Sequence, residues 1–257
     1  MNRLRLMFFT MFLIAGPAFG QDLRTAPRME ALASNQLKVA GNACGPAALL
    51  SAFRFGEIRW DNPVNALEKE TDREQVLAII RRYGGRSSNS LKGHQRWSKR
   101  GVNLADLTDI ANEMGRPFFL PQLKAEVFQG MGDEASGKVF RNAHDSLRDS
   151  LKDGFPPVLS VRRFVYRNGE WSVLSAHFVT LISLPDRLEE NATSFPIIYL
   201  DPWGGRRCDG VVSVQAQGYA AGLPVNPEVD FPQTPIGKSL VKANEGTVVV
   251  LSAAILR

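Results

Sequence analysis

The sequence predicts an α+β fold, with N-terminal helices packed on a mostly antiparallel β-sheet. Segments whose apolar residues recur at helical spacing occupy the first part of the chain, up to about residue 153. Segments rich in β-branched and aromatic residues occupy the rest. Helices and strands that are segregated along the chain are typical of α+β proteins, whereas a doubly wound parallel fold alternates them.

Capping residues bound the helical segments. The first strong helix is expected to begin at Cys44 and to end at Gly56, and Asn103 and Gly115 bound another in the same way. The remaining expectations in this half are helices at 62–70, 71–83 (capped by Thr71 or Asp72) and 142–153, a short helix around 28–33, a short strand at 118–120, and loops at 87–100 and 128–138.

The C-terminal part predicts a strand-rich sheet. Two strands within 156–184 are joined by a turn at Asn168-Gly169, a dipeptide typical of tight hairpins. Three more strands are expected within 195–205, 210–217 and 246–256. The Pro-rich stretch 222–236 is expected to be an irregular insertion.

Composition and charge limit the classes of function. The 257 residues are 44% hydrophobic and 22% charged, which suits one well-cored domain over 21–257. The formal net charge of +5 is dispersed along the chain, so a nucleic-acid footprint is not expected. Two cysteines and three scattered histidines lack the spacing of a zinc site, and no Gly-rich phosphate loop precedes a helix, so neither a metal nor a cofactor is expected.

The N-terminus has the pattern of a secretory signal peptide. Arg3 and Arg5 precede an apolar run at 6–16, and small residues follow at Ala18 and Gly20. The run is too short to span a bilayer comfortably. Residues 1–20 are therefore expected to be a removed signal, and the mature protein to be secreted or periplasmic without stable membrane insertion.

Cys44 is a candidate nucleophile because it opens a helix. The thiolate is the reactive form of cysteine, and the N-terminus of a helix stabilises it. Pro46 suits the first helical turn, and Gly45 permits a close approach of another backbone or a substrate. Two other interpretations remain open at this point: a buried packing residue, or a disulfide with Cys208.

His177 is the candidate base. His94 lies in a basic loop and His144 on the polar face of an expected helix, so both are predicted to be surface residues. His177 opens the apolar strand segment "HFVTLISL", where the backbone would anchor its ring. The following strand ends in Asp201, which would orient the ring if the two strands are neighbours, and Trp203 could shield the pair from water.

Three short stretches resemble a known family. "ACGPAAL" at a helix start, "HFVTLIS" on a strand and "YLDPWGG" on the next are similar to the papain-like cysteine peptidases of bacteria, especially the bacteriocin-processing, double-glycine-leader peptidase family. The resemblance covers about residues 38–203. It implies a papain-like fold, with Cys44 as the nucleophile, His177 as the general base and Asp201 as the orienting residue.

The sequence departs from that family at one position. The family usually carries a glutamine about six residues before the cysteine, where it helps to stabilise the oxyanion, and here that position is Lys38. Gln36 and Asn42 are the two amides near enough to replace it.

Three functions follow from these residues. The leading hypothesis is an exported thiol hydrolase that cleaves a peptide or amide bond in a peptide or protein substrate through Cys44, His177 and Asp201. The resemblance also admits an acyltransferase of the phytochelatin-synthase type. The third hypothesis is a non-catalytic envelope binding module that retains the fold.

Overall fold

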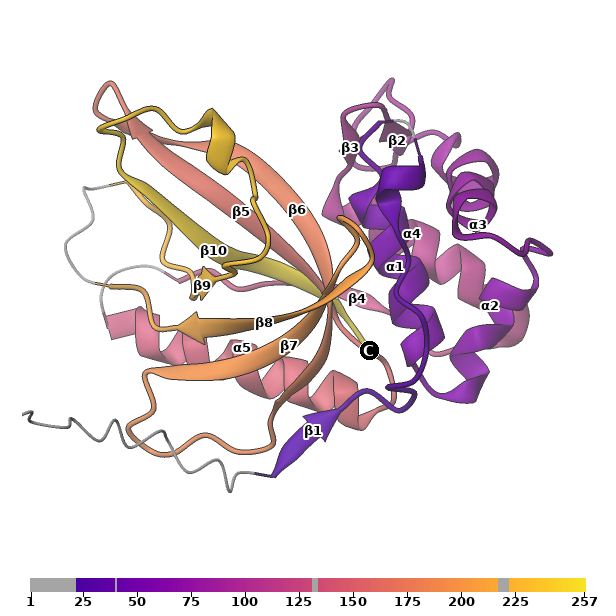
Figure 1. Ribbon diagram of the computed structural model, residues 1–257, viewed down its shortest axis with the longest axis horizontal. Helices are drawn as coiled ribbons and strands as arrows, with labels where there is room; N and C mark the ends of the chain where they lie inside the picture. Colours follow the sequence, from indigo (N-terminus) through magenta and orange to yellow (C-terminus); the bar gives the residue numbers. More distant parts are fainter. Residues whose placement is uncertain (1–21, 40, 131–133, 217–221) are drawn as a thin grey trace, which may run out of the picture.

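The computed structural model describes residues 22–39, 41–130, 134–216 and 222–257, so the expected signal peptide lies outside the described residues. Most of the helices lie on one side of the molecule and a large sheet lies on the other (Figure 1). The prediction of a mixed α and β fold with an antiparallel sheet is confirmed. Within these residues, no helix has the length and apolar character needed to cross a membrane.

The helical side is built around one buried helix. It contains α1 (Cys44–Phe55), α2 (Asn62–Asn65), α3 (Asp72–Ile79), α4 (Leu104–Gly115) and the small hairpin β2 (Trp97–Ser98) and β3 (Gly101–Val102). Every residue of α1 except Arg54 is buried, because α1 contacts α2, α3 and α4 on one side and the sheet on the other. A helix that is apolar on all sides suits this central place.

The expected caps bound the helices. The Thr71 side chain accepts a hydrogen bond from the Glu74 N–H, and the Glu74 carboxylate accepts one from the Thr71 N–H, which forms a capping box at the start of α3. The Asn103 side chain accepts from the Asp106 N–H at the start of α4. The predicted starts of α1, α3 and α4 are therefore confirmed.

The sheet contains the strands β1 (Leu23–Thr25), β4 (Lys124–Val127), β5 (Val158–Arg167), β6 (Glu170–Pro185), β7 (Ser194–Asp201), β8 (Arg206–Ser213), β9 (Glu228–Asp230) and β10 (Thr247–Leu256). All pairings between them are antiparallel in the described part of the chain. β5 to β10 form a closed circuit, with β1 attached to β6 and β4 attached to β10. The curvature of this circuit brings β6 and β7 together beside α1.

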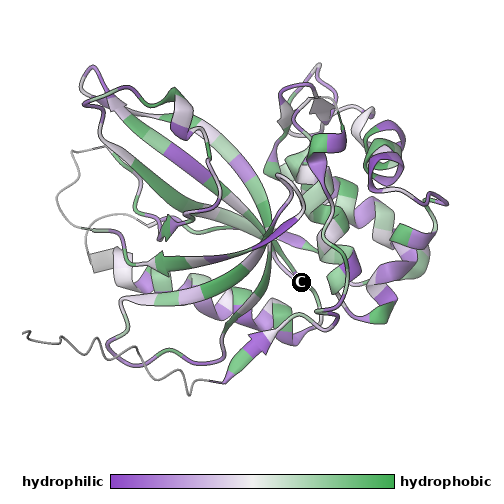
Figure 2. Cartoon of the chain, in the orientation of Figure 1, coloured by the Kyte–Doolittle hydropathy of each residue, from purple (hydrophilic) through white to green (hydrophobic). Residues whose placement is uncertain are grey.

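α5 (Glu134–Lys152) packs against the sheet, and residues of both form one hydrophobic core. Its Leu147 and Leu151 are buried, as the sequence predicts, and the Phe140 ring packs 5.2 Å from the Phe195 ring of β7. Figure 2 shows hydrophobic residues along the strands, whereas α5 alternates between hydrophobic and hydrophilic positions. The amphipathic helix therefore buries one face against the sheet.

The β5–β6 turn has the geometry that its sequence favours. Asn168 and Gly169 have φ angles of 53° and 87°, so both adopt the left-handed conformation of the tight turns that match the twist of a hairpin. The predicted hairpin is confirmed.

Several local predictions are wrong. The helix expected at 62–70 is α-helical only at Asn62–Asn65, and the expected loop 87–100 contains β2. The segment 28–33 is a turn and not a helix, and 118–120 begins at the last residue of a 3₁₀ turn (Arg116–Phe118) and forms no strand. α5 begins inside the expected loop 128–138, and the Pro-rich insertion contains β9. The short strands β1, β4 and β9 have three or four residues each, too few for a periodic pattern.

His144 is also not a surface residue. It is 1% exposed, its Nε2 lies 2.8 Å from the Pro185 carbonyl oxygen, and its ring packs edge-on against Phe195. The imidazole of His144 is thus part of the core, and the Pro185 carbonyl supplies the hydrogen-bond partner that a buried polar ring needs. His94 is exposed, as predicted.

Candidate active site

Cys44 is the first residue of α1 and is 4% exposed. The Ala47 N–H donates to the Ala43 carbonyl at 3.0 Å, which begins the hydrogen-bond ladder of the helix. The N–H groups of Cys44 and Gly45 therefore precede that ladder, and Pro46 has none to leave unpaired. These two N–H groups and the positive end of the helix dipole surround the thiol with partial positive charge.

Gly45 lets the end of α1 approach its neighbours. A Cβ atom at this position would lie 2.5 Å from Cγ1 of Val102 in β3 and 3.4 Å from the ring of Phe178 in β6. The first distance is far inside van der Waals contact, so glycine is needed here for close packing. The adjacent thiol is thereby held against β6.

His177 comes from β6, at a different place from the one expected. β6 begins at Glu170, so His177 lies inside the strand, opposite Val161 of β5, and does not open it. Its Nε2–H donates to Oδ1 of Asp201 at 2.8 Å. The thiol of Cys44 is close enough to raise the pKa of the ring, and Nδ1 is the ring nitrogen that the bond to Asp201 leaves free. The imidazole thus lies between the carboxylate and the thiol.

Asp201 is the last residue of β7 and is completely buried. β6 and β7 pair as the sequence predicts, and this pairing brings Asp201 beside His177. Oδ1 also accepts from the Trp203 N–H at 2.8 Å, and Oδ2 accepts from the Thr234 hydroxyl at 2.8 Å. Trp203 is 47% exposed, so its indole is not packed over the pair as a full shield. Its backbone N–H, in contrast, contacts Asp201 directly.

The electrostatics favour a charged imidazole. Burial disfavours the imidazolium, but the hydrogen bonds and charges of Asp201 and Cys44 outweigh it and raise the pKa of His177 from 6.5 to about 9. Burial likewise opposes ionisation of Asp201, whereas His177, Trp203 and Thr234 hold its pKa below the usual 3.8. The two groups therefore form an imidazolium–carboxylate pair at neutral pH.

A cavity of about 560 Å³ opens at this pair. His177, Trp203, Gln36 and Asn42 line it, together with the segment 234–237. It offers a substrate space next to the imidazole, within the usual size range of ligand sites.

The two candidate amides lie differently in this cavity. Gln36 is 5% exposed, its N–H donates to the Pro202 carbonyl at 2.8 Å, and its Oε1 is buried without a hydrogen-bond partner in the described part of the chain. Asn42 is exposed, and its Nδ2 donates to the Arg100 carbonyl at 3.5 Å. The backbone of Gln36 is therefore fixed next to Asp201 by the bond to Pro202, and its side-chain oxygen has no partner in the described part of the chain. The Asn42 amide, in contrast, is bonded to the loop that contains Arg100.

Cys208 does not form a disulfide with Cys44, because both cysteines are free. The disulfide interpretation is therefore wrong. Cys208 lies in β8 next to Tyr199, and burial, followed by the charge of Asp201, raises the pKa of its thiol.

Thr234 is the site residue that the sequence did not reveal. Its hydroxyl donates to Asp201 and accepts from the Tyr199 hydroxyl at 2.9 Å, although Thr234 lies 33 residues from Asp201 in the chain. The next residues stay close to the site because the Arg163 Nε donates to the Ile236 carbonyl at 2.8 Å. A threonine in a Pro-rich segment carries no local signal of this position.

Among the described residues, no group of three or more histidine, cysteine, aspartate or glutamate side chains is placed to hold a metal ion. Comparison with protein-family models, with curated proteins and with solved structures found no match to this chain. The chemistry of the site is therefore inferred from its own geometry.

Proposed function

We propose that this protein is a thiol hydrolase that cleaves a peptide or amide bond. The observation that carries the proposal is the position of the His177 ring, between the buried carboxylate of Asp201 and the thiol at the start of α1. A nucleophile, a base and an orienting acceptor in this order are the parts that thiol catalysis requires. The antiparallel sheet facing a helical lobe, with the cysteine on the helix between them, supports a papain-like fold.

In the proposed reaction, the proton of the Cys44 thiol already resides on His177 Nδ1, so that the resting pair is a thiolate and an imidazolium, as the raised pKa of His177 favours. The thiolate attacks the carbonyl carbon of the substrate, and the imidazolium gives its proton to the leaving amine. Water, deprotonated by the same imidazole, then attacks the thioester and releases the acid, which restores the thiolate and the imidazolium. Asp201 keeps Nε2 protonated and Nδ1 directed at the sulfur throughout.

Gln36 is the proposed side-chain donor to the oxyanion, together with the Cys44 N–H. Its buried amide lines the cavity, and the backbone bond to Pro202 fixes it beside Asp201. Asn42 is the less suitable donor because its amide already contacts the Arg100 carbonyl. Donors fixed in advance at the place where charge develops are among the largest contributions to acyl-transfer catalysis.

The substrate proposed is a peptide or protein outside the cytoplasm. The signal-like sequence at residues 1–20 supports a secreted or periplasmic location for the mature chain. The open cavity of about 560 Å³ is large enough for a few residues of an extended peptide.

Covalent trapping tests this proposal. Full-length protein is incubated with a peptidyl chloromethyl ketone library, digested with trypsin and analysed by mass spectrometry. Cys44 and Cys208 fall in different tryptic peptides, 39–54 and 208–238, so each thiol is read separately. The proposal expects adducts on 39–54 that disappear in His177→Ala. Modification of both peptides at equal, slow rates would refute it.

A further inference from the structure

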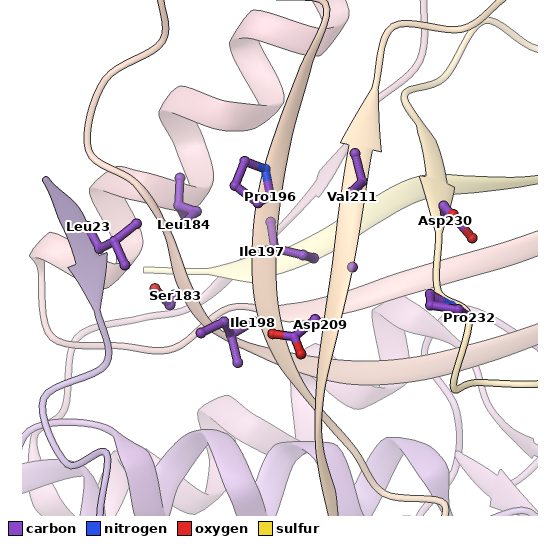
Figure 3. A pocket seen from close by; sticks show the side chains of 11 residues that line it. Leu23, Ser183, Leu184, Pro196, Ile197, Ile198, Asp209, Val211, Asp230 and Pro232 are labelled. Atoms are coloured by element: carbon purple, nitrogen blue, oxygen red, sulfur yellow. The ribbon is translucent and has the colours of Figure 1, made fainter. Parts of the chain in front are cut away.

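A second cavity of about 530 Å³ lies on the sheet, apart from the residues of the candidate active site. Figure 3 shows its lining side chains on β1, β6, β7, β8 and the segment around β9. Phe195, Ile197 and Tyr199 of β7 are buried in the core, and Pro196 and Ile198 alternate with them. Pro196 and Ile198 therefore belong to the opposite, outward face of the strand.

The strand register joins these outward residues into one patch. Ile198 of β7 is opposite Asp209 of β8, and Pro196 is opposite Val211. Val211 is in turn opposite Asp230 of β9. Residues directly opposite on antiparallel strands have neighbouring side chains on the same face, so the five side chains are contiguous.

The patch is apolar and incompletely covered. Leu23 and Val211 are 54% and 40% exposed, and both line the cavity. Leu184 and Ile197 also line the cavity, but they are nearly fully buried and belong to the core beneath it, so the outward apolar surface is that of Leu23, Pro196, Ile198 and Val211. Exposed apolar side chains that gather in a hollow mark a site of interaction more often than those scattered singly.

The charge of the patch is opposite to that of the chain. The formal net charge of the chain is +5, yet the charged residues that line this cavity are Asp209 and Asp230. Both side chains are exposed, and neither makes an ion pair in the described part of the chain. Two unpaired carboxylates at the edge of an apolar floor are complementary to a cationic group attached to an apolar one.

The backbone next to the patch has an open edge. Among the described residues, β6 pairs with β7 only at Ile198, Tyr199 and Leu200, so 194–197 pair on one side, with β8. β1 has three residues and pairs only with β6. Strands with unpaired edges are the places where an extended peptide can be added to a sheet.

We propose that this cavity is a docking site for an extended segment of another protein, in which apolar residues are flanked by lysine or arginine. The apolar side chains would enter the hollow over Pro196, Ile198 and Val211, and the basic ones would meet Asp209 and Asp230. The proposal is independent of the thiol chemistry, because none of these residues contacts Cys44, His177 or Asp201 in the hydrogen bonds described.

Peptide binding by the full-length protein tests it. The probe is a fluorescein-labelled peptide of two valines and a leucine flanked by lysines, and its partner is the same peptide with glutamates in place of the lysines. Fluorescence anisotropy at low salt is expected to show binding of the lysine peptide about tenfold tighter, with the preference weakening as salt screens the charges. Equal binding of the two peptides would overturn the proposal.

Matched charge variants locate the site. The double variant Asp209→Asn, Asp230→Asn is expected to lose the preference for lysine, whereas Glu70→Gln, Glu170→Gln, which removes two exposed carboxylates elsewhere, is expected to keep it. Val211→Ser is expected to weaken the binding of both peptides, because it removes an apolar contact and leaves the charges unchanged. A preference for lysine that survives the two aspartate changes would overturn the proposal. Concentration-dependent dimerisation in analytical ultracentrifugation that Val211→Ser abolishes would also overturn it, since a second copy of the chain would then occupy this face.

Discussion

Cys44 and Cys208 are both free and almost equally buried, at 4% and 2% exposure, yet their surroundings differ in kind. Cys44 opens a helix and interacts with an imidazole, whereas Cys208 lies within a strand beside a tyrosine. Burial alone makes a thiol inert. The partner and the backbone therefore decide which of the two is reactive.

One carboxylate acts on the surroundings of both thiols. Asp201 stabilises the imidazolium of His177 next to Cys44, and its negative charge also raises the pKa of Cys208. Thr234 and Tyr199 connect it to the Cys208 side by hydrogen bonds of 2.8 and 2.9 Å. A single buried carboxylate therefore stabilises the imidazolium beside one cysteine and raises the pKa of the other cysteine.

Removing each thiol in turn should give the largest contrast. Cys44→Ala is expected to lower the turnover of a fluorogenic peptide substrate by a factor on the order of 10³ or more, because it removes the nucleophile. Cys208→Ser is expected to retain activity within about twofold. Equal losses in the two variants would break the distinction between the cysteines.

Neutralising the shared carboxylate should affect both cysteines. Asp201→Asn is expected to lower kcat by roughly 10²–10⁴, because the ring loses its charged partner and its tautomer is no longer fixed. The same change is expected to lower the pKa of Cys208, whose alkylation should accelerate at high pH. Activity assays and alkylation rates measured on one preparation check both effects, and a Cys208 rate that does not rise would contradict the shared role.

The two candidate amides can be separated by kinetics. Gln36→Ala is expected to lower kcat by about 10²–10³ with little change in KM, as loss of an oxyanion donor does. Asn42→Ala is expected to change kcat by less than about fivefold, since its amide already donates to the Arg100 carbonyl. The reverse order would transfer the donor role to Asn42.

The raised pKa of His177 should appear in the pH dependence of stability. Because folding raises this pKa from 6.5 to about 9, the folded state binds the proton more tightly than the unfolded state does. The resulting stabilisation is complete below pH 6.5 and is lost as the pH rises through about 9. The Tm of the parent protein should therefore fall between pH 6 and pH 10 by more than the Tm of His177→Gln does. Parallel plots of Tm against pH for the two proteins would contradict a raised pKa of His177.

Thr234 should give the smallest effect. Thr234→Val removes the donor to Asp201 and is expected to lower kcat by about threefold to tenfold and the free energy of unfolding by about 1 kcal/mol. Thr234→Ser keeps the hydroxyl and should restore most of the activity. If serine and valine are equally impaired, the threonine acts through packing and not through its hydrogen bonds.

The features that could be predicted from the sequence are those that depend on residues adjacent in the chain. The helix start at Cys44, the caps at Thr71 and Asn103, and the turn at Asn168-Gly169 each depend on a few adjacent residues, and the structure has all of them. The neighbourhood of His177 and Asp201 also follows from local information, because they lie on consecutive strands that pair.

The features that were missed depend on distant parts of the chain. Thr234 reaches Asp201 from a segment whose path is set by β9 and Arg163, and no local pattern records that path. The choice between Gln36 and Asn42 depends on a loop fastened to the Pro202 carbonyl. His144 was misplaced because the core accepts a polar ring once a carbonyl satisfies it.

The relative alkylation rates of the two cysteines test the central claim most directly. Folded protein is treated with limiting iodoacetamide at neutral pH, and labelling of the tryptic peptides 39–54 and 208–238 is followed over time in the parent protein and in His177→Ala. Cys44 is expected to react about 100-fold faster than Cys208, and His177→Ala is expected to remove most of this difference. Equal rates in the parent protein, or a fast Cys44 that does not depend on His177, would contradict it.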